Sequence, residues 1–269
     1  MTYLEKSFDR VNVLGVGVSA INPSIASSFL IEAVKNKKNS YVCVTGVHGI
    51  IESHRSKELK EIHNRSLLTV PDGMPAVWVG LEQGFYSMRK VYGPDLMLDI
   101  FSKTSEKNNN FTHFLYGAND NILSSMKKKL EAQFPHSNIV GTYSPPFRDL
   151  NENEENEISK ILNLQKPDFM WVGLSTPKQE IFMSKYSHKF DVGIMIGVGA
   201  AFPIRAGIIK DAPNWIKNSG FQWLFRLIQD PKRLWKRYLD IIPRFIFLIL
   251  LQLFGIKEFS FDKSKKEKA

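Results

Sequence analysis

Asp72 is the residue of this sequence whose type and position are best suited to chemistry. It stands between Pro71 and Gly73, directly after an apolar stretch at residues 67–70. In α/β sheets, ligands bind at the loops that follow the carboxyl ends of the strands. A carboxylate in such a loop can take a proton from an acceptor hydroxyl as a general base. On local grounds alone, an ordinary Asp-Gly turn is the alternative interpretation.

A second candidate site follows the apolar run at residues 168–174. Thr176 is expected to cap a helix whose first residue is Pro177. The free N–H groups at the start of such a helix attract a phosphate or a sugar oxygen. Lys178 and Gln179 would project from the first turn. A routine capped helix start explains the same residues.

Three arginines near the C-terminal end have the spacing of one helical face. Arg226, Arg233 and Arg237 are separated by seven and four residues, so they align if one helix continues through Asp230 and Pro231. Each guanidinium presents a planar fork of donors that suits a diphosphate. The spacing therefore favours a diphosphate site, and a solvated basic surface is the alternative.

The sequence favours neither a metal nor an organic cofactor. It has no Asp-x-Asp motif and no His/Cys cluster with zinc spacing. The Gly-Val-Gly at 15–17 superficially matches a dinucleotide fingerprint, which requires an acidic residue about 20 positions later. That region holds Lys35, Lys37 and Lys38 instead. We interpret the glycines as a tight strand-to-helix turn, and we expect arginines to stabilise any departing diphosphate.

The elements that would position these residues alternate along the chain. Segments with helical spacing, such as 121–133 and 151–164, separate short apolar runs that predict buried strands. This alternation predicts an α/β fold, Rossmann-like, with a mostly parallel sheet and helices on both faces. The predicted strands are at residues 11–18, 41–44, 67–70, 113–116, 138–141, 168–174 and 193–198.

The length of 269 residues suits one large α/β domain, or one domain and an appendage. We expect a catalytic domain at residues 1–210 and a basic, aromatic helical appendage at 211–269. The only cysteine is Cys43, which fits a reducing compartment. Residues 1–10 carry charges of both signs and no apolar core of a secretory signal. We therefore expect a cytoplasmic protein.

The expected appendage is basic and partly apolar. Residues 205–269 contain 14 Lys or Arg and 6 Asp or Glu, so this segment has a net charge of +8, and the whole chain has a formal net charge of +9. The apolar run 241–256 is interrupted by Pro243 and Arg244 and is shorter than the roughly 20 residues of a spanning helix. We expect it to lie in a membrane interface, with basic flanks and a polar tail on anionic headgroups. A helix packed on the core or on another subunit is the alternative.

Seven motifs, taken together, resemble a known family. The chain resembles, from about residue 11 to 239, the WecG/TagA/CpsF glycosyltransferases of bacterial surface-polymer synthesis. Each motif is weak alone, but the ordered set is specific. They are VTGVHGIIES (44–53), PDGMPAVW (71–78), VYGPDLM (91–97), FLYG (114–117), VGLSTPKQE (172–180), GVGAAF (197–202) and APNWIKNSGFQWLFRLIQDPKRLWKRYL (212–239).

The resemblance implies a Rossmann-like domain without a metal centre. Members transfer N-acetylmannosamine, its uronic acid or a related sugar from a UDP donor. The acceptor is a polyprenyl-diphosphate-linked sugar at the inner face of the cytoplasmic membrane. The linkage forms with inversion, so one carboxylate base suffices, and Asp72 matches the family's candidate. The matching substrate-binding positions are Thr45, Gly46, His48, Lys90, Asp95, Gln179, Arg226, Arg233 and Arg237.

Five positions depart from the family's pattern. Gly46 stands where many members carry Asn, and Lys90, beside Arg89, replaces a pocket arginine. Pro203 replaces a pocket acid, and the appendage reads GFQW in place of GLEW. These departures keep a second hypothesis open, a non-catalytic scaffold that binds lipid-linked intermediates or partner enzymes. A nucleic-acid-binding protein is disfavoured because the positive charge lies beside an apolar segment. The appendage is expected to become ordered on a membrane or in a homo-oligomer.

Overall fold

The computed structural model describes residues 8–36, 39–106 and 109–261. Lys37, Lys38 and most of the polar tail lie outside the described residues. The chain forms two compact units. The described part of the first consists of Ser24–Cys43 and Gly93–Lys210, and that of the second consists of Phe8–Pro23, Val44–Tyr92 and residues 211–261.

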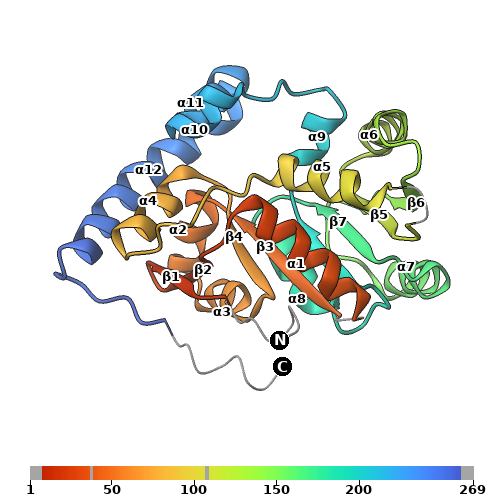
Figure 1. Ribbon diagram of the computed structural model, residues 1–269, viewed down its shortest axis with the longest axis horizontal. Helices are drawn as coiled ribbons and strands as arrows, with labels where there is room; N and C mark the ends of the chain where they lie inside the picture. The colour runs from red at the N-terminus through yellow and green to blue at the C-terminus, as the bar shows by residue number, and fades with distance from the viewer. Residues whose placement is uncertain (1–7, 37–38, 107–108, 262–269) are drawn as a thin grey trace. The chain divides into compact units, whose positions relative to one another are not determined.

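Six of the strands form one sheet with the order β4-β3-β8-β7-β5-β6 (Figure 1). The pairs β3/β8, β8/β7, β7/β5 and β5/β6 are all parallel. Helices flank this sheet, which explains why its strands read as continuous apolar runs. The predicted α/β class with a mostly parallel sheet is confirmed. The strands are β3 (Ser40–Thr45), β4 (Leu68–Pro71), β5 (Thr112–Gly117), β6 (Asn138–Tyr143), β7 (Phe169–Gly173) and β8 (Ile194–Gly197).

Two helices of the first unit begin at asparagines that cap them. Asn119 accepts from the backbone N–H of Ile122 at the start of α6. Asn151 and Glu154 form a capping box at the start of α7, with bonds of 3.0 and 2.9 Å. The helices predicted at 121–133 and 151–164 are confirmed. The helices of this unit are α1 (Pro23–Lys35), α5 (Gly93–Thr104), α6 (Asp120–Gln133), α7 (Glu152–Gln165), α8 (Lys178–Tyr186) and α9 (Ala201–Arg205).

A stacked aromatic cluster forms part of the core of the first unit. The His113 ring is fully buried and stacks on Phe101, with ring centroids 4.0 Å apart. Trp171 Nε1 donates to His113 Nδ1 at 3.2 Å, so Nε2 carries the proton and bonds Thr104 Oγ1 at 3.0 Å. Burial lowers the pKa of His113 to about 3. His113 is therefore a neutral core residue.

The second unit contains a β-hairpin where a single strand was predicted. Residues 11–18 split into β1 (Arg10–Val13) and β2 (Val16–Ser19), which pair antiparallel in a sheet of their own. Leu14 and Gly15 form the turn with φ of 52° and 86°, the positive values that a tight two-residue hairpin requires. The expectation of a strand-to-helix turn at these glycines is therefore wrong.

The longest helix of the second unit, α12, continues through Pro243. Proline removes one helical hydrogen bond, at a cost of about 3 kcal/mol. Burial of Ile241, Phe245 and Leu248 on either side offsets this cost. The helices of this unit are α2 (Val47–Arg55), α3 (Lys57–Arg65), α4 (Met74–Glu82), α10 (Asn214–Ser219), α11 (Gln222–Gln229) and α12 (Pro231–Leu253).

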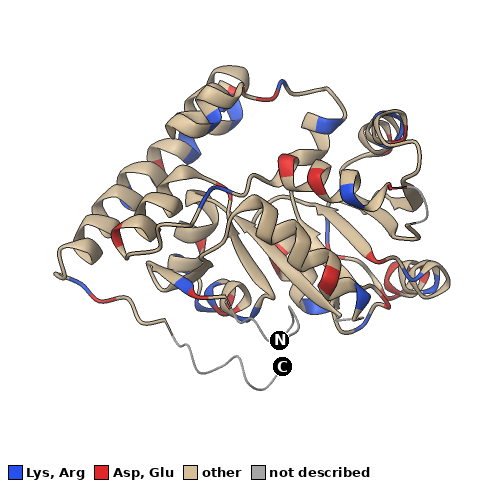
Figure 2. Ribbon diagram, in the orientation of Figure 1, with Lys and Arg blue, Asp and Glu red and all other residues tan. Residues whose placement is uncertain are grey.

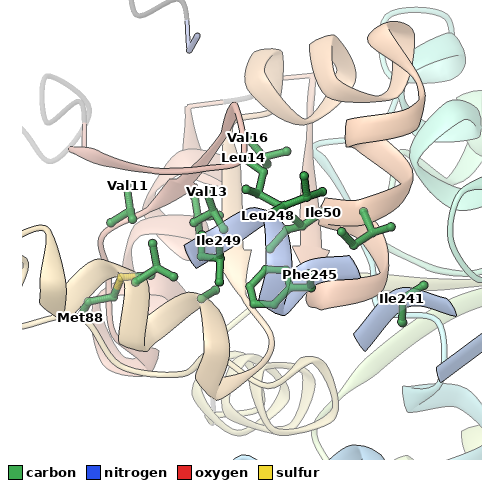
Figure 3. Packing of buried hydrophobic residues seen from close by; sticks show 14 residues of the cluster. Val11, Val13, Leu14, Val16, Ile50, Met88, Ile241, Phe245, Leu248 and Ile249 are labelled. Carbon is green, nitrogen blue, oxygen red and sulfur yellow. The ribbon is translucent and has the colours of Figure 1, made fainter. Parts of the chain in front are cut away.

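The two faces of α12 differ. Ile241, Phe245, Leu248 and Ile249 pack with the β1/β2 hairpin and α2 in one apolar cluster (Figure 3). The opposite face exposes large apolar side chains, and Phe247 is 62% exposed. One face of the segment 241–256, which was predicted to lie in a membrane interface, is therefore packed against the protein. Within the described parts of the chain, no helix has the length and apolar character needed to cross a membrane. The other exposed large apolar residues on or after α12 are Trp235, Leu239, Ile246, Leu250, Leu253, Phe254 and Ile256.

Candidate active site

Asp72 lies in the second unit, between the end of β4 and the start of α4. Its backbone N–H donates to the carbonyl of Thr45, the last residue of β3, at 3.0 Å. The carbonyl of Pro71 accepts from the N–H of Val91 at 2.8 Å. Gly73 is the N-cap of α4 and has extended backbone angles. These contacts fix the backbone on both sides of the half-buried Asp72.

Thr45 and Gly46 lie beside Asp72. A Cβ added at Gly46 would come 3.9 Å from Oδ2 of Asp72, which is ordinary van der Waals contact. Thr45 is 2% exposed, and its hydroxyl oxygen has no hydrogen-bond partner within the described residues. The structure therefore brings together three of the residues that the sequence singled out, and the backbone leaves room for an asparagine Cβ at position 46.

Lys90 belongs to a polar cluster that the sequence did not predict. Its ammonium donates to the backbone carbonyl of Lys217 at 2.6 Å. The Lys217 ammonium, on a side chain only 8% exposed, lies 2.8 Å from Oδ2 of Asp211. Tyr92 Oη bonds Oδ1 of the same carboxylate at 3.1 Å. Burial, then the charges of Asp72 and Asp211, raise the pKa of Tyr92, which keeps its hydroxyl protonated.

His48 is the second residue of α2 and lies in a positive environment. Burial and, next in size, the charge of Arg237 lower its pKa to about 4, with smaller contributions from Arg55 and Arg226. Glu52 acts in the opposite direction. At neutral pH the imidazole is uncharged, so it can donate one hydrogen bond and accept another.

The three arginines do not share one helix, so the condition for their alignment on one helical face is not met. Asp230 has φ −141° and ψ 64°, which separates α11 from α12. The cause is Pro231, because a residue before proline is disfavoured in helical conformation. The three guanidinium charges are nevertheless close to one another. Burial is the main cause that lowers the pKa of Arg237, and the charges of Arg233 and Arg226 lower it as well. Figure 2 shows the basic residues on α11 and the first part of α12.

Gln179 lies in the first unit, in the first turn of α8, and is 3% exposed. The expectation that Thr176 caps this helix is wrong. Pro177 occupies the N-cap position, and Thr176 Oγ1 instead donates to Glu180 Oε1 at 3.0 Å. The reason is that Glu180 is 1% exposed, and a buried carboxylate requires hydrogen-bond donors.

Asp95 lies in the first turn of α5, also in the first unit. Its Oδ1 forms an ion pair with Arg205 at 3.2 Å. Arg205 ends α9, whose first turn contains Pro203. The first four N–H groups of a helix lack helical partners, so proline at this position removes no helical hydrogen bond. The substitution by Pro203 is therefore compatible with the local fold.

Each unit thus holds its own group of predicted residues. The second unit holds Thr45, Gly46, His48, Asp72, Lys90, Arg226, Arg233 and Arg237. The first holds Asp95 and Gln179. Sequence reasoning missed Tyr92, Lys217, Asp211 and Glu180. Tyr92, Lys217 and Glu180 lie within the family motifs quoted above, which could have marked them as candidates. The sequence did not show that they are buried.

Comparisons with known proteins identify relatives of this chain. Residues 11–258 match the family described as "Glycosyl transferase WecG/TagA/CpsF family". A protein of Bacillus subtilis (strain 168) is 26% identical over 265 residues, which cover 98% of this chain and 90% of that protein. A protein of Staphylococcus aureus (strain MW2) is 29% identical over 189 residues, which cover 70% of this chain and 71% of that protein.

Both relatives carry the name N-acetylglucosaminyldiphosphoundecaprenol N-acetyl-beta-D-mannosaminyltransferase. A Bacillus spizizenii protein of the same name is 25% identical over 213 residues, 79% of each chain. The family match covers nearly the whole chain and includes all the candidate site residues. This chain belongs to the WecG/TagA/CpsF family and is a glycosyltransferase.

Proposed function

We propose that this protein transfers N-acetylmannosamine from a UDP donor to a polyprenyl-diphosphate-linked N-acetylglucosamine, with inversion at the anomeric carbon. The names of the relatives support the sugar and the acceptor. The observation that carries the proposal is Asp72, held at the end of β4 by its bond to Thr45. The related uronic acid is the nearest alternative sugar.

Asp72 is the general base of the proposed reaction. The acceptor hydroxyl oxygen attacks the anomeric carbon of the donor while its proton passes to the Asp72 carboxylate. The bond from the anomeric carbon to the phosphate oxygen breaks, and UDP leaves with the electron pair. A single displacement of this kind inverts the configuration and requires only one carboxylate.

The diphosphate of UDP binds near Arg226 and Arg237 in this proposal. Within the described residues, neither arginine forms an ion pair with a carboxylate. Burial makes the Arg237 charge costly unless an anion accompanies it, as its lowered pKa indicates. Neutral His48, close to the same charges, supplies a hydrogen bond. Together these groups stabilise the negative charge that develops on the leaving group.

Thr45, Gly46, Lys90, Asp95 and Gln179 complete the proposed substrate-binding set. Thr45 supports this assignment best, because its buried hydroxyl oxygen lacks a partner within the described residues and lies beside Asp72. Lys90 is held by the Lys217 carbonyl. In the second unit, Thr45, Gly46 and Lys90 are proposed to bind the sugar substrates, and the arginines to bind the diphosphate. Asp95 and Gln179 are proposed substrate-binding residues of the first unit.

The exposed face of α12 brings the site to the inner face of the cytoplasmic membrane in this proposal. Leu239, Ile246, Leu250 and Leu253 recur at helical spacing on that face and are all at least 43% exposed. Lys232, Lys236 and Arg244 provide positive charge on the same helix. An apolar face flanked by basic residues favours an anionic membrane surface. Residues 211–269 would form the membrane-binding appendage, as predicted from the sequence.

A non-catalytic scaffold is the second candidate, and the departures at Gly46 and Pro203 favour it. One experiment separates the two candidates. Release of UDP is measured from a panel of UDP-sugars, with and without a synthetic lipid-diphosphate-sugar acceptor, in EDTA. Acceptor-dependent release from UDP-N-acetylmannosamine supports a metal-independent transferase. Absence of release from every donor, with folded protein and vesicles present, would favour the scaffold.

A further inference from the structure

Two neighbouring side chains on α8, Gln179 of the proposed substrate-binding set and Glu180, each have a buried oxygen without a hydrogen-bond partner within the described residues. These atoms are Oε1 of Gln179 and Oε2 of Glu180. Both side chains are at least 97% buried, with 3% and 1% exposed. A buried acceptor that lacks a donor destabilises the folded protein. Two such acceptors on one helical turn indicate a ligand that supplies donors.

The other atoms of these two side chains are engaged with each other. Gln179 Nε2 donates to Glu180 Oε1 at 2.9 Å, and Thr176 Oγ1 donates to the same oxygen at 3.0 Å. An ionised carboxylate repels an amide oxygen and attracts an NH2 group. Glu180 therefore sets the orientation of the Gln179 amide and turns its oxygen away from the carboxylate.

The surroundings of the amide provide a second observation. Gly197 and Gly199 end β8 and begin the following loop, where α/β sheets bind ligands. A Cβ at Gly197 would come 3.1 Å from Gln179 Nε2, and one at Gly199 would come 3.2 Å from Oε1. Gly199 also has φ +46°, which disfavours other residues. Glycine at both positions thus leaves the amide uncrowded.

We infer that Glu180 is a positioning residue that makes Gln179 an obligate hydrogen-bond acceptor, so that this subsite takes an uncharged, hydrogen-bond-donating group of the nucleotide sugar. The inference rests on the proposed function and deepens it. A hydroxyl or an N–H group of the sugar or of uridine satisfies both oxygens. A phosphate does not, because it offers acceptors only and carries the same sign of charge as Glu180.

The first test needs no ligand. We compare the side-chain amide signals of Gln179 by 15N NMR in the wild type, Glu180→Gln and the control Glu155→Gln, and assign them through their loss in Gln179→Met. Glu155 is a suitable control because its carboxylate also accepts from two side chains, Lys185 and Tyr186, in the same unit. We expect a downfield, slowly exchanging Gln179 proton in the wild type and the control, and its loss in Glu180→Gln. An unchanged signal in Glu180→Gln would overturn the inference.

The second test identifies the group that is bound. Affinities for pyrophosphate, UDP and UDP-N-acetylmannosamine are measured by calorimetry on the same proteins. We expect Glu180→Gln and Gln179→Met to weaken nucleotide binding about tenfold and to leave pyrophosphate within about twofold. Loss already seen with UDP places the donating group on uridine, and loss confined to the UDP-sugar places it on the sugar.

Equal weakening of pyrophosphate, unchanged affinities in both variants, or a wild-type protein that binds none of the three probes would overturn the inference. The test is separate from that of the proposed function. A wild-type protein with the expected amide signal and binding pattern, but without sugar transfer, would refute the proposed reaction and leave the role of Glu180 intact.

Discussion

The backbone N–H of Asp72 donates a 3.0 Å hydrogen bond to the carbonyl of Thr45. This bond joins the loop after β4 to the last residue of β3, and it involves no side chain. The backbone bond that holds this loop therefore does not require the charge of the Asp72 side chain. A substitution that changes only that charge tests the chemistry without disturbing the loop.

For Asp72→Asn, we expect kcat to fall by about 10²–10⁴-fold, because asparagine cannot accept the proton of the acceptor hydroxyl. Donor affinity should change little, since the backbone bond to Thr45 remains. Steady-state kinetics and calorimetry with the UDP donor measure the two effects. Asp99→Asn, which removes an exposed charge paired with Lys103, is the matched control. Transfer near the wild-type rate in Asp72→Asn would exclude this residue as the base.

For Arg237→Gln, we expect about tenfold weaker binding of UDP, because the substitution removes a half-buried guanidinium that is proposed to contact the diphosphate. The same substitution should raise the pKa of His48 toward its ordinary value, since Arg237 is the charge that lowers it most. NMR titration of the His48 ring measures this shift. Arg244→Gln, farther along α12 and paired with Asp240, should change neither quantity. Unaltered UDP affinity in Arg237→Gln would contradict the diphosphate assignment.

For Lys217→Met, we expect the free energy of unfolding to fall by about 3 kcal/mol, because Asp211 loses its buried cation. Asp211→Leu should cost a similar amount, and the double variant less than the sum of the two. Urea denaturation of the four proteins of this cycle measures the coupling. Strictly additive costs would show that the two charges do not stabilise each other.

The stability of the protein should depend on pH through His113. Its folded-state pKa, about 3, lies below the unfolded value of about 6.5, so the unfolded chain binds the proton first as the pH falls. We expect the free energy of unfolding to decrease by about 2 kcal/mol between pH 7 and pH 5 from this residue. Urea denaturation at both pH values measures the change. His113→Phe, although less stable overall, should lose this part of the pH dependence.

The two faces of α12 should respond differently to substitution. Phe245→Ala should cost about 3–5 kcal/mol of unfolding free energy, because Phe245 is 5% exposed within the apolar cluster. Phe247→Ala, at a 62% exposed position, should cost less than about 0.5 kcal/mol. It should nevertheless weaken binding to anionic vesicles in a sedimentation assay. Full vesicle binding by Phe247→Ala would argue against a membrane role for that face.

The sequence by itself determined the α/β class and the order of the strands along the chain. Continuous apolar runs at β3, β5, β7 and β8 predicted buried parallel strands, since a sheet covered on both faces has no polar side. The position of Asp72 after β4 followed from the same pattern. These features depend on residues that are close in sequence, so the pattern of apolar residues is enough to predict them.

The tertiary structure alone decided which polar groups became buried and with what partners. The Lys217–Asp211 pair and the Gln179–Glu180 pair owe their properties to burial. The apolar pattern also did not predict the hairpin turn at Leu14 or the break between helices at Asp230. The turn depends on positive φ values, and the break depends on the proline that follows Asp230. The periodicity of apolar residues indicates only which face of a segment is buried on average. The pKa of a buried group, and the donors that reach it, depend on residues distant in sequence that only the folded chain brings together.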